Sequence, residues 1–148
     1  MSSKLPIAYI EIRVLANATE DPEKVLTAVR NILPEELSEG IIFQKTALTG
    51  HHGNPIILFR TKLTDKQALL SVLEKIGAGL TPLDKDTLEK NLKLHLEKRN
   101  LYIRFYKQSA YNSKFRISHN DPIHFKIHFK NKIFSEIIEI CRNAGVLP

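Results

Sequence analysis

Two adjacent histidines, His51 and His52, lie between glycines in the segment LTGHHGNPI, residues 48–56. Imidazole titrates near neutral pH, so one ring of a histidine pair can donate a proton while the other accepts one, as in acid–base cleavage of RNA. Neutral imidazole is also a common metal ligand. Gly50 and Gly53 can adopt positive φ, which suits a tight turn. Three interpretations are therefore open: a metal site, a catalytic loop, and a turn between two strands.

The surrounding residues favour the turn. A zinc site needs three or four convergent ligands, whereas adjacent side chains in an extended segment diverge. The segment contains no carboxylate, and the lone Cys141 follows Ile137, Ile138 and Ile140, which predicts a buried thiol. The sequence has no HExxH, GxSxG or P-loop motif. We therefore expect no metal, no cofactor and no catalytic residue, with a ribonuclease dependent on His51 and His52 as the catalytic alternative.

Charge is unevenly distributed along the 148 residues, whose net charge is +6. Residues 98–148 contain ten Lys and Arg against three Asp and Glu, while residues 1–97 are close to neutral. A basic surface of this kind usually faces nucleic acid or anionic lipid. We expect a single domain over residues 1–148 with no membrane segment, because no run approaches the ~18 apolar residues of a membrane span. The free cysteine and the absence of a signal-like start favour the cytoplasm.

Hydrophobic periodicity predicts mixed helices and strands. Asp21 precedes Pro22 as a helix N-cap, and Thr64 with Gln67 forms a candidate capping box. The connections between the last strands are too short for crossover helices, which favours an α+β fold with a mostly antiparallel sheet and helices packed on one face. Strands are expected at 7–16, 41–48, 56–63, 101–106, 114–118 and 123–130, and helices at 22–33, 64–77, 81–96 and 134–144.

Alternation in the last three expected strands predicts a basic face opposite the core. We expect no acidic side chain on this face, and the like charges on adjacent strands would be tolerated more easily beside a polyanion. The predicted members are Tyr102, Arg104, Tyr106, Lys114, Arg116, His124, Lys126, His128 and Lys130.

Tyrosines among cations on an open sheet suit unpaired RNA, because aromatic rings stack on bases of any sequence. A solvated outer face is the structural alternative, since Lys, Arg and Tyr are ordinary strand residues. A lipid surface fits less well, because it selects a basic amphipathic helix. In KQSAY, residues 107–111, Gln108 could bond phosphate and Tyr111 could stack, or Tyr111 could instead plug a corner between strands.

Three segments together resemble a known family: ATEDPEKVLTAVRNILP, LTGHHGNPI, and LYIRFYKQSAY followed by DPIHFKI. They are similar to an archaeal RNA-binding family often described as predicted exosome subunits. The resemblance implies a fold similar to the large-subunit ribosomal protein that contacts 5S RNA. Lys107, Gln108 and Tyr111 match the third motif, whereas Tyr106 and Ser109 depart from the acidic residue and the alanine expected there.

These observations predict a non-catalytic RNA-binding protein that acts as an accessory of RNA processing or degradation machinery. The alternative is a protein-interaction adaptor in a ribonucleoprotein complex. Expected partners are single-stranded or structured RNA and proteins of an RNA-processing complex, with no membrane. His124 and His128 are expected to add charge as pH falls. The predicted RNA-contacting residues are Tyr102, Arg104, Tyr106, Lys107, Gln108, Tyr111, Lys114, Arg116, His124, Lys126, His128, Lys130, His51 and His52.

Overall fold

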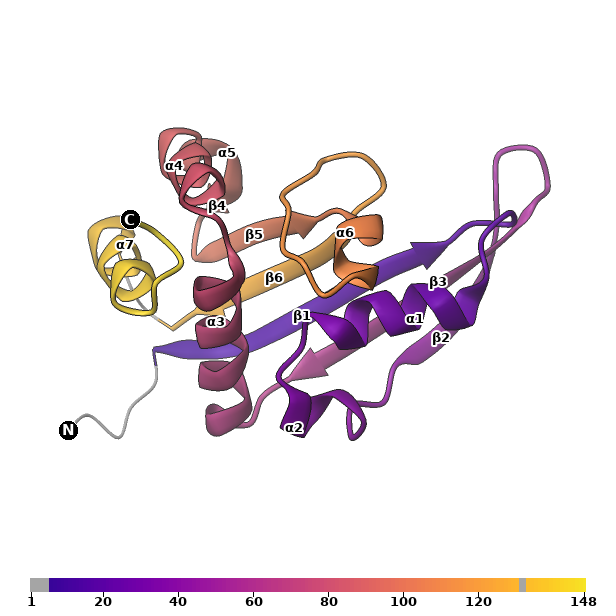
Figure 1. Cartoon of the computed structure of the whole chain (residues 1–148), viewed down its shortest axis with the longest axis horizontal. Helices are drawn as coiled ribbons and strands as arrows, with labels where there is room; N and C mark the ends of the chain where they lie inside the picture. The colour runs from indigo at the N-terminus through magenta and orange to yellow at the C-terminus, as the bar shows by residue number, and fades with distance from the viewer. Residues whose placement is uncertain (1–5, 131–132) are drawn as a thin grey trace.

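The computed structural model describes residues 6–130 and 133–148. Strands and helices are mixed along the chain, which begins with a long strand and ends with a helix (Figure 1). The elements in chain order are β1 Ile7–Ala16, α1 Pro22–Asn31, α2 Glu35–Ser38, β2 Gln44–Thr49, β3 Pro55–Leu63, α3 Lys66–Gly79, α4 Pro82–Lys90, α5 Leu92–His95, β4 Leu96–Glu97, β5 Asn100–Phe105, α6 Lys107–Tyr111, β6 Ile123–Phe129 and α7 Phe134–Asn143.

The six strands form one sheet in the order β2-β3-β1-β6-β5-β4, and every neighbouring pair is antiparallel. β1 is central and pairs with β3 on one side and β6 on the other. Helices α1 and α3 cross in front of the strands, and α6 lies beside α1 (Figure 1). The predicted α+β class with a mostly antiparallel sheet is confirmed, while the likeness to a ribosomal protein stays a prediction.

Strict alternation on the central strands places the core on the helix side of the sheet. Ile10, Ile12, Phe105, Phe125 and Phe129 are fully buried there, together with the apolar faces of α1 and α3. The intervening side chains of β1, β5 and β6 are partly exposed on the opposite face. Burying a large apolar side chain contributes roughly 1.5–3 kcal/mol, so this alternation determines which way every side chain of the sheet points.

A second packing contact joins α3 to the C-terminal segment. Gly77 of α3 lies so close to the backbone of Ala144 and Gly145 that a side chain at this position would overlap the Ala144 carbonyl oxygen. An ion pair between Arg142 Nη2 and Glu89 Oε2, 3.0 Å apart, links α7 to α4 on the surface. The absence of a Cβ at Gly77 therefore permits the close approach of α3 and the end of α7.

Several predicted boundaries hold and others shift. Asp21 caps α1, its side chain accepting the Glu23 amide hydrogen at 3.0 Å, as expected. The predicted capping box of α3 is wrong, because Asp65 rather than Thr64 is the N-cap and accepts from the Ala68 amide. Aspartate is at least as strong an N-cap as threonine, so the helix begins one residue later. It ends at Gly79 rather than at residue 77, and β2 begins at residue 44 rather than 41.

Tertiary pairing overrides two further predictions. The helix expected over 81–96 ends at Lys90, and Leu96 instead pairs with Leu101 in the β4–β5 hairpin. The strand expected over 114–118 is reduced to isolated bridges, from Phe115 to Leu80 and from Ile117 to Phe105. Residues 107–111, expected as a corner between strands, form the short helix α6.

Cys141 is buried, as expected from its isoleucine neighbours. Burial raises the pKa of its thiol to about 12, so the sulfur stays protonated. None of the helices in the described part of the chain combines the length and apolar character that crossing a bilayer requires.

Replacing Gly77 by alanine should destabilise the protein by about 1–3 kcal/mol, because the new methyl group separates α3 from the Ala144 backbone. The matched control is Gly40→Ala, where the nearest atom to the added carbon is the Leu37 carbonyl oxygen at 3.8 Å. This control should gain about 0.4–1 kcal/mol through the unfolded state. Urea unfolding measures both, and equal unfolding midpoints for the two variants would contradict the packing account.

Candidate functional site

The open face of the sheet carries the polar residues that alternate with the core. On β5 and β6 these include Tyr102, Arg104, His124, Lys126 and His128, all partly exposed. Cross-strand pairing places Tyr102 opposite Lys126 and Arg104 opposite His124. These five predicted residues therefore lie together on one surface, as the alternation predicted.

Strands β1 and β3 extend this face, although the sequence-based prediction did not include them. Tyr9 and Arg13 on β1 and Arg60 and Lys62 on β3 occupy the same side, as the pairing shows. The signal was present in the sequence, because β1 alternates Glu11 and Arg13 with buried isoleucines. What the sequence did not supply was the strand order that places β1 next to β6.

One row of residues crosses four neighbouring strands at a single register. Arg60 pairs with Arg13, Arg13 pairs with His124, and His124 pairs with Arg104. With ~4.8 Å between strands, the row is about 14 Å long and runs perpendicular to the strands. We call these four residues the arginine row. Arg60 and Arg13 are opposed like charges on adjacent strands, and such a pair destabilises a sheet by up to ~1 kcal/mol, so the row favours binding of an anion.

The prediction that this face carries no acidic side chain is wrong. Glu11 lies on β1 between Lys62 of β3 and Lys126 of β6. Its carboxylate Oε1 also lies 4.0 Å from Arg13 Nε. Glu11 thus neutralises part of the positive charge of Lys62 and Lys126, which lie next to the arginine row. The acidic residue was missed because β1 was not assigned to the same surface.

Aromatic rings on this face are held between neighbouring side chains. The Tyr9 ring stacks on His128 with centroids 4.9 Å apart, and Lys62 Nζ lies 4.3 Å from the Tyr9 centroid. Because β6 and β3 flank β1 on opposite sides, both faces of the Tyr9 ring are occupied. Tyr102 meets the His124 ring at 5.4 Å and lies on β5, near the sheet edge. The Arg104 guanidinium carbon also lies 5.7 Å from the Tyr102 centroid, so Tyr102 and a cation neighbour each other at this end of the face.

The histidines of this face are neutral at physiological pH. Desolvation and the nearby Arg13, Arg104 and Lys126 lower the pKa of His124 to about 4. Desolvation and Lys126 also lower the pKa of His128, whose Nδ1 donates to Asn100 Oδ1 at 2.7 Å. The expectation that both rings gain charge as pH falls is corrected for the free protein, in which His124 stays uncharged down to about pH 4.

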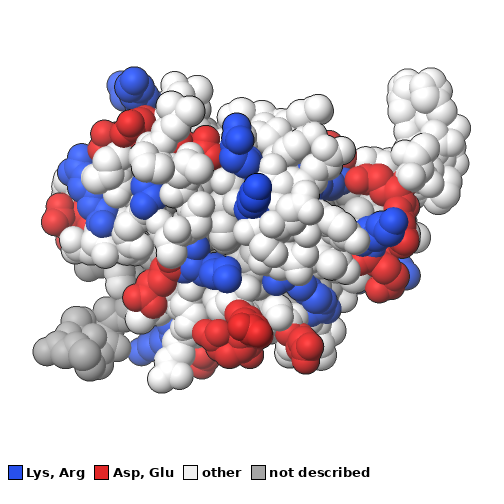
Figure 2. Space-filling view, viewed as in Figure 1, with Lys and Arg blue, Asp and Glu red and all other residues white. Residues whose placement is uncertain are grey.

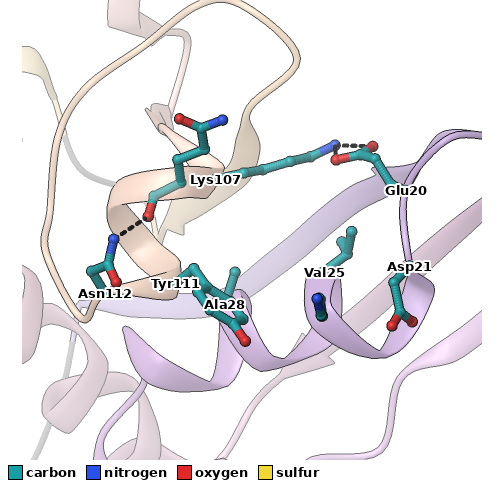
Figure 3. A pocket seen from close by; sticks show the side chains of 9 residues that line it. Glu20, Asp21, Val25, Ala28, Lys107, Tyr111 and Asn112 are labelled. Atoms are coloured by element: carbon teal, nitrogen blue, oxygen red, sulfur yellow. Dashed lines mark hydrogen bonds and ion pairs between the residues drawn. The ribbon is translucent and has the colours of Figure 1, made fainter.

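Lys107 does not lie on the sheet face. Its side chain is almost completely buried, and Nζ donates to the Leu15 carbonyl oxygen at 2.6 Å and to Asp121 Oδ2 at 2.8 Å. Nζ also donates to Glu20 Oε1 at 3.0 Å (Figure 3). Asn17 Nδ2 donates to the same two carboxylates. The expected surface phosphate contact is thus replaced by a buried ammonium that joins β1, the β1–α1 loop and the segment before β6.

The remaining predicted residues of α6 lie on the helix side. Gln108 and Tyr111 line a groove of about 400 Å³ between α6 and α1, whose floor includes Val25 and Ala28 (Figure 3). Tyr111 is 45% exposed, so it does not plug a corner between strands. Basic and acidic residues are interspersed over this side of the molecule (Figure 2).

Four other predicted cations and aromatics flank the face rather than occupy its centre. Tyr106 follows β5, and its hydroxyl donates to Gln108. Arg116 lies at the β5 edge, 3.8 Å from Asp84 of α4. Lys114 lines a hollow beside the end of α3, and the exposed Lys130 follows β6.

His51 and His52 occupy the tip of the β2–β3 hairpin, which projects beyond the rest of the sheet (Figure 1). The predicted turn is confirmed: Gly50 N–H donates to the Asn54 carbonyl oxygen at 2.7 Å, and Gly53 has φ 78°. The two rings lie edge to face, 4.8 Å apart. A hollow of about 170 Å³ beside them is lined by Asn17, Ala18 and Thr19 of the β1–α1 loop and, within the described residues, by no carboxylate.

No group of three or more His, Cys, Asp and Glu converges as metal ligands would anywhere in residues 6–130 and 133–148. The sheet face presents hydrogen-bond donors, fixed positive charges and aromatic rings. Such groups can bind anions and planar rings.

Comparison with known proteins identifies relatives over most of the chain. A family model described as RNA binding matches residues 9–129. The chain is 34% identical over 133 residues to an RNA-binding protein of Pyrococcus abyssi, with 88% of this chain and 86% of that protein covered. It is 32% identical over 130 residues to an uncharacterized protein of Methanocaldococcus jannaschii, with 85% of each covered.

A solved structure shares the fold. The DUF54 protein of Methanothermobacter thermautotrophicus is 27% identical and superposes with a TM-score of 0.74. The match covers 96% of this chain and 98% of the other. The arrangement of strands and helices around the open sheet is therefore shared with that protein.

Lys107→Met should lower the free energy of unfolding by about 2 kcal/mol, because the partly buried carboxylates of Glu20 and Asp121 lose their shared cation. The control Lys114→Met removes an equal charge from an exposed position and should change stability by less than about 0.5 kcal/mol. Guanidinium unfolding compares them. Equal losses in the two variants would show that the Lys107 cluster is not stabilising.

His124 should titrate near pH 4 in histidine-selective NMR spectra. Because the folded pKa is lower than the unfolded value of 6.5, the unfolded state binds more protons between these values, and stability falls as pH drops from 6.5 toward 4. His124→Asn lacks this contribution. The free energy of unfolding of the wild type minus that of the variant should therefore decrease as pH is lowered from 6.5 to 4. A difference that stays constant with pH would contradict the lowered pKa of His124.

Proposed function

This chain belongs to the family whose model is described as RNA binding, and on that premise we propose that it is a non-catalytic RNA-binding protein whose open sheet face contacts the RNA. The observation that carries the proposal is the arginine row, in which Arg60, Arg13 and Arg104 reach one register from three strands. A backbone of evenly spaced phosphates running across the strands would meet these guanidinium groups in succession.

Charge balance on the face supports an anionic ligand. Among the described residues, no carboxylate lies within 4 Å of the Arg60 or Arg104 guanidinium groups, and the only carboxylate near Arg13 is that of Glu11, at the 4.0 Å limit. Guanidinium groups make two parallel hydrogen bonds to phosphate oxygens, so unpaired arginines are well suited to this ligand. Phosphate contacts position nucleic acid without reading its sequence. We therefore expect an affinity that depends little on base sequence.

Stacking of RNA bases on aromatic side chains would add affinity that depends little on base sequence. A base placed on Tyr102 would contribute ~1–3 kcal/mol. Tyr9, held between Lys62 and His128, instead fixes the positions of a cation and an imidazole on the face. Lys126 and Lys130 lie on β6 and just beyond its end, where they would extend the phosphate track along the strand.

The β2–β3 hairpin is a second point of contact in this proposal. Its tip exposes His51, His52 and the backbone around Gly53 beyond the edge of the face. Exposed amides and imidazoles in a glycine turn can bond phosphate oxygens. The hairpin would thereby touch RNA without cutting it.

We place this activity within RNA processing or degradation, as an accessory that holds RNA for an exosome-like machine. The resemblance of the histidine turn and of KQSAY to predicted exosome subunits supports this setting. The protein named RNA-binding in Pyrococcus abyssi supports the RNA contact alone.

A protein-interaction adaptor is the second candidate. The groove between α1 and α6 favours it, because Val25 and Ala28 form an apolar floor beside the exposed Tyr111. Capture of partners from an RNase-treated lysate separates the two functions. An adaptor keeps its partner, whereas an RNA binder releases whatever the RNA had bridged.

The double variant Arg60→Gln with Lys62→Gln tests the sheet face. Both residues are exposed on β3, so the fold should be unaffected. RNA affinity should fall by about tenfold or more, and the slope of log affinity against log salt should become shallower by about 0.7 for each phosphate of single-stranded RNA that the variant no longer neutralises. Fluorescence anisotropy at several salt concentrations measures both quantities.

The matched control is Lys66→Gln with Lys75→Gln, which removes the same charge from exposed positions of α3 on the helix side. This variant should retain the salt slope of the wild type. The sheet face is not the RNA surface if both double variants weaken binding equally.

A further inference from the structure

A hollow of about 470 Å³ lies beside the arginine row. Arg13, His124 and Arg104 form one side of it, and Leu15 and Leu58, which pair across β1 and β3, line it as well. His119, Asp121 and Pro122, from the segment that precedes β6, line the side away from the row. The hollow is thus lined by cations on one side and by the loop of residues 119–122 on the other.

The single acidic group among the residues lining this hollow is already neutralised. Asp121 Oδ2 accepts from Lys107 Nζ at 2.8 Å and from Asn17 Nδ2 at 2.7 Å. Its carboxylate is therefore drawn toward the buried ammonium and does not pair with either arginine. The buried cluster around Lys107 leaves the Arg13 and Arg104 side of the hollow positively charged.

His124, which lines the same hollow, has an unsatisfied polar atom. Its Nδ1 is buried and has no hydrogen-bond partner within the described part of the chain. A buried polar atom without a partner costs about 1–3 kcal/mol, unless a ligand supplies the bond. A phosphate oxygen at this position would accept a hydrogen bond from Nδ1–H.

From this geometry we propose that the hollow binds the phosphorylated end of an RNA chain, with Arg13, Arg104 and His124 around the terminal phosphate. The inference rests on the proposed RNA-binding function and assigns a preferred RNA end to the same face. Leu15, Leu58 and Pro122 would contact the terminal ribose or base, for which the hollow has room beyond the phosphate itself.

Charge explains why a terminal phosphate fits better than an internal one. A phosphate monoester carries about −1.5 to −2 charges near pH 7, whereas an internal diester carries about −1. Two arginines flanking one imidazole match the monoester, because the imidazole can take up a proton beside a second negative charge. The loop of His119, Asp121 and Pro122 lines the side of the hollow opposite the arginines.

The pKa of His124 should respond to this ligand. In the free protein it is lowered by desolvation, by Arg13 of β1, by Arg104 of β5 and by Lys126 of β6. The hollow is also lined by His119 and by Asp121, whose carboxylate is bound by Lys107. A dianionic phosphate among these groups offsets the cations, so its binding raises the pKa of His124 from about 4.

The test compares one short single-stranded RNA with a 5′-phosphate, with a 3′-phosphate, or with hydroxyls at both ends, in anisotropy titrations of the intact protein. One phosphorylated form should bind about tenfold more tightly than the hydroxyl form. A hydroxyl-ended RNA longer by one nucleotide controls for the added charge. Equal affinity for all three forms, or a preference no larger than that control gives, overturns the inference.

Arg104→Gln should abolish the preference for the phosphorylated end. Arg60→Gln, in the same row but outside the hollow, should weaken all three RNAs alike and keep the preference. Persistence of the preference in Arg104→Gln would overturn the assignment. In NMR spectra of the wild type, the preferred RNA should raise the pKa of His124 more than the hydroxyl-ended RNA does.

The outcomes distinguish the inference from the function on which it rests. If no RNA binds at low salt, the sheet face is not an RNA surface and both proposals fail. If RNA binds with a normal salt dependence but without preference for a phosphorylated end, the sheet-face proposal stands and the end-binding hollow is wrong.

Discussion

Successive side chains of a β-strand point to opposite faces, and burial of one face determines everything displayed on the other. Phe105, Phe125 and Phe129 are fully buried beneath the helices. A shift of one residue in the register of β6 would expose the Phe125 and Phe129 rings and bury His124, Lys126 and His128. The core therefore holds the cations of the sheet in place, although it makes no ion pair with them.

Antiparallel pairing of the strands brings the exposed side chains of different strands together on one surface. Arg13, Arg60 and Arg104 are far apart in the sequence, and the pairing of β3, β1, β6 and β5 brings them to one register. Their mutual repulsion is modest at an exposed surface, and it is available to be relieved when an anion binds. Desolvation, together with Arg13 and Arg104, lowers the pKa of His124 and keeps its ring neutral near pH 7.

The Lys107 cluster gives the site its boundary. A nearly buried ammonium joins the end of β1, the β1–α1 loop and the segment that precedes β6. Because Lys107 binds the Asp121 carboxylate, this carboxylate does not pair with Arg13 or Arg104. The same contact holds the loop of residues 119–122 against the end of β1. A residue with no exposed charge thus shapes an electrostatic surface through the groups that it neutralises.

The sequence by itself determined the class of the fold, most element boundaries, the glycine turn at His51 and His52, and the side on which β5 and β6 display their cations. These features depend on neighbours in the chain: strand alternation, helix caps and turn residues. Glu11, Tyr9 and Arg60 were not assigned to the face, and Lys107 was placed on the surface. The strand predicted at 114–118 is a further error, because the structure has only isolated bridges there.

Only the tertiary structure decided which residues share the sheet face and which charged side chain is buried. Strand order and the burial of a charge depend on residues that are distant in sequence. β1 joins the basic face because it pairs with β6, and Lys107 is buried because Glu20 and Asp121 converge on it. Phe115 packs against Phe105 and α3 instead of extending a strand. Periodicity reports which way a side chain points relative to its own strand, whereas the neighbours it meets are set by how the whole chain folds.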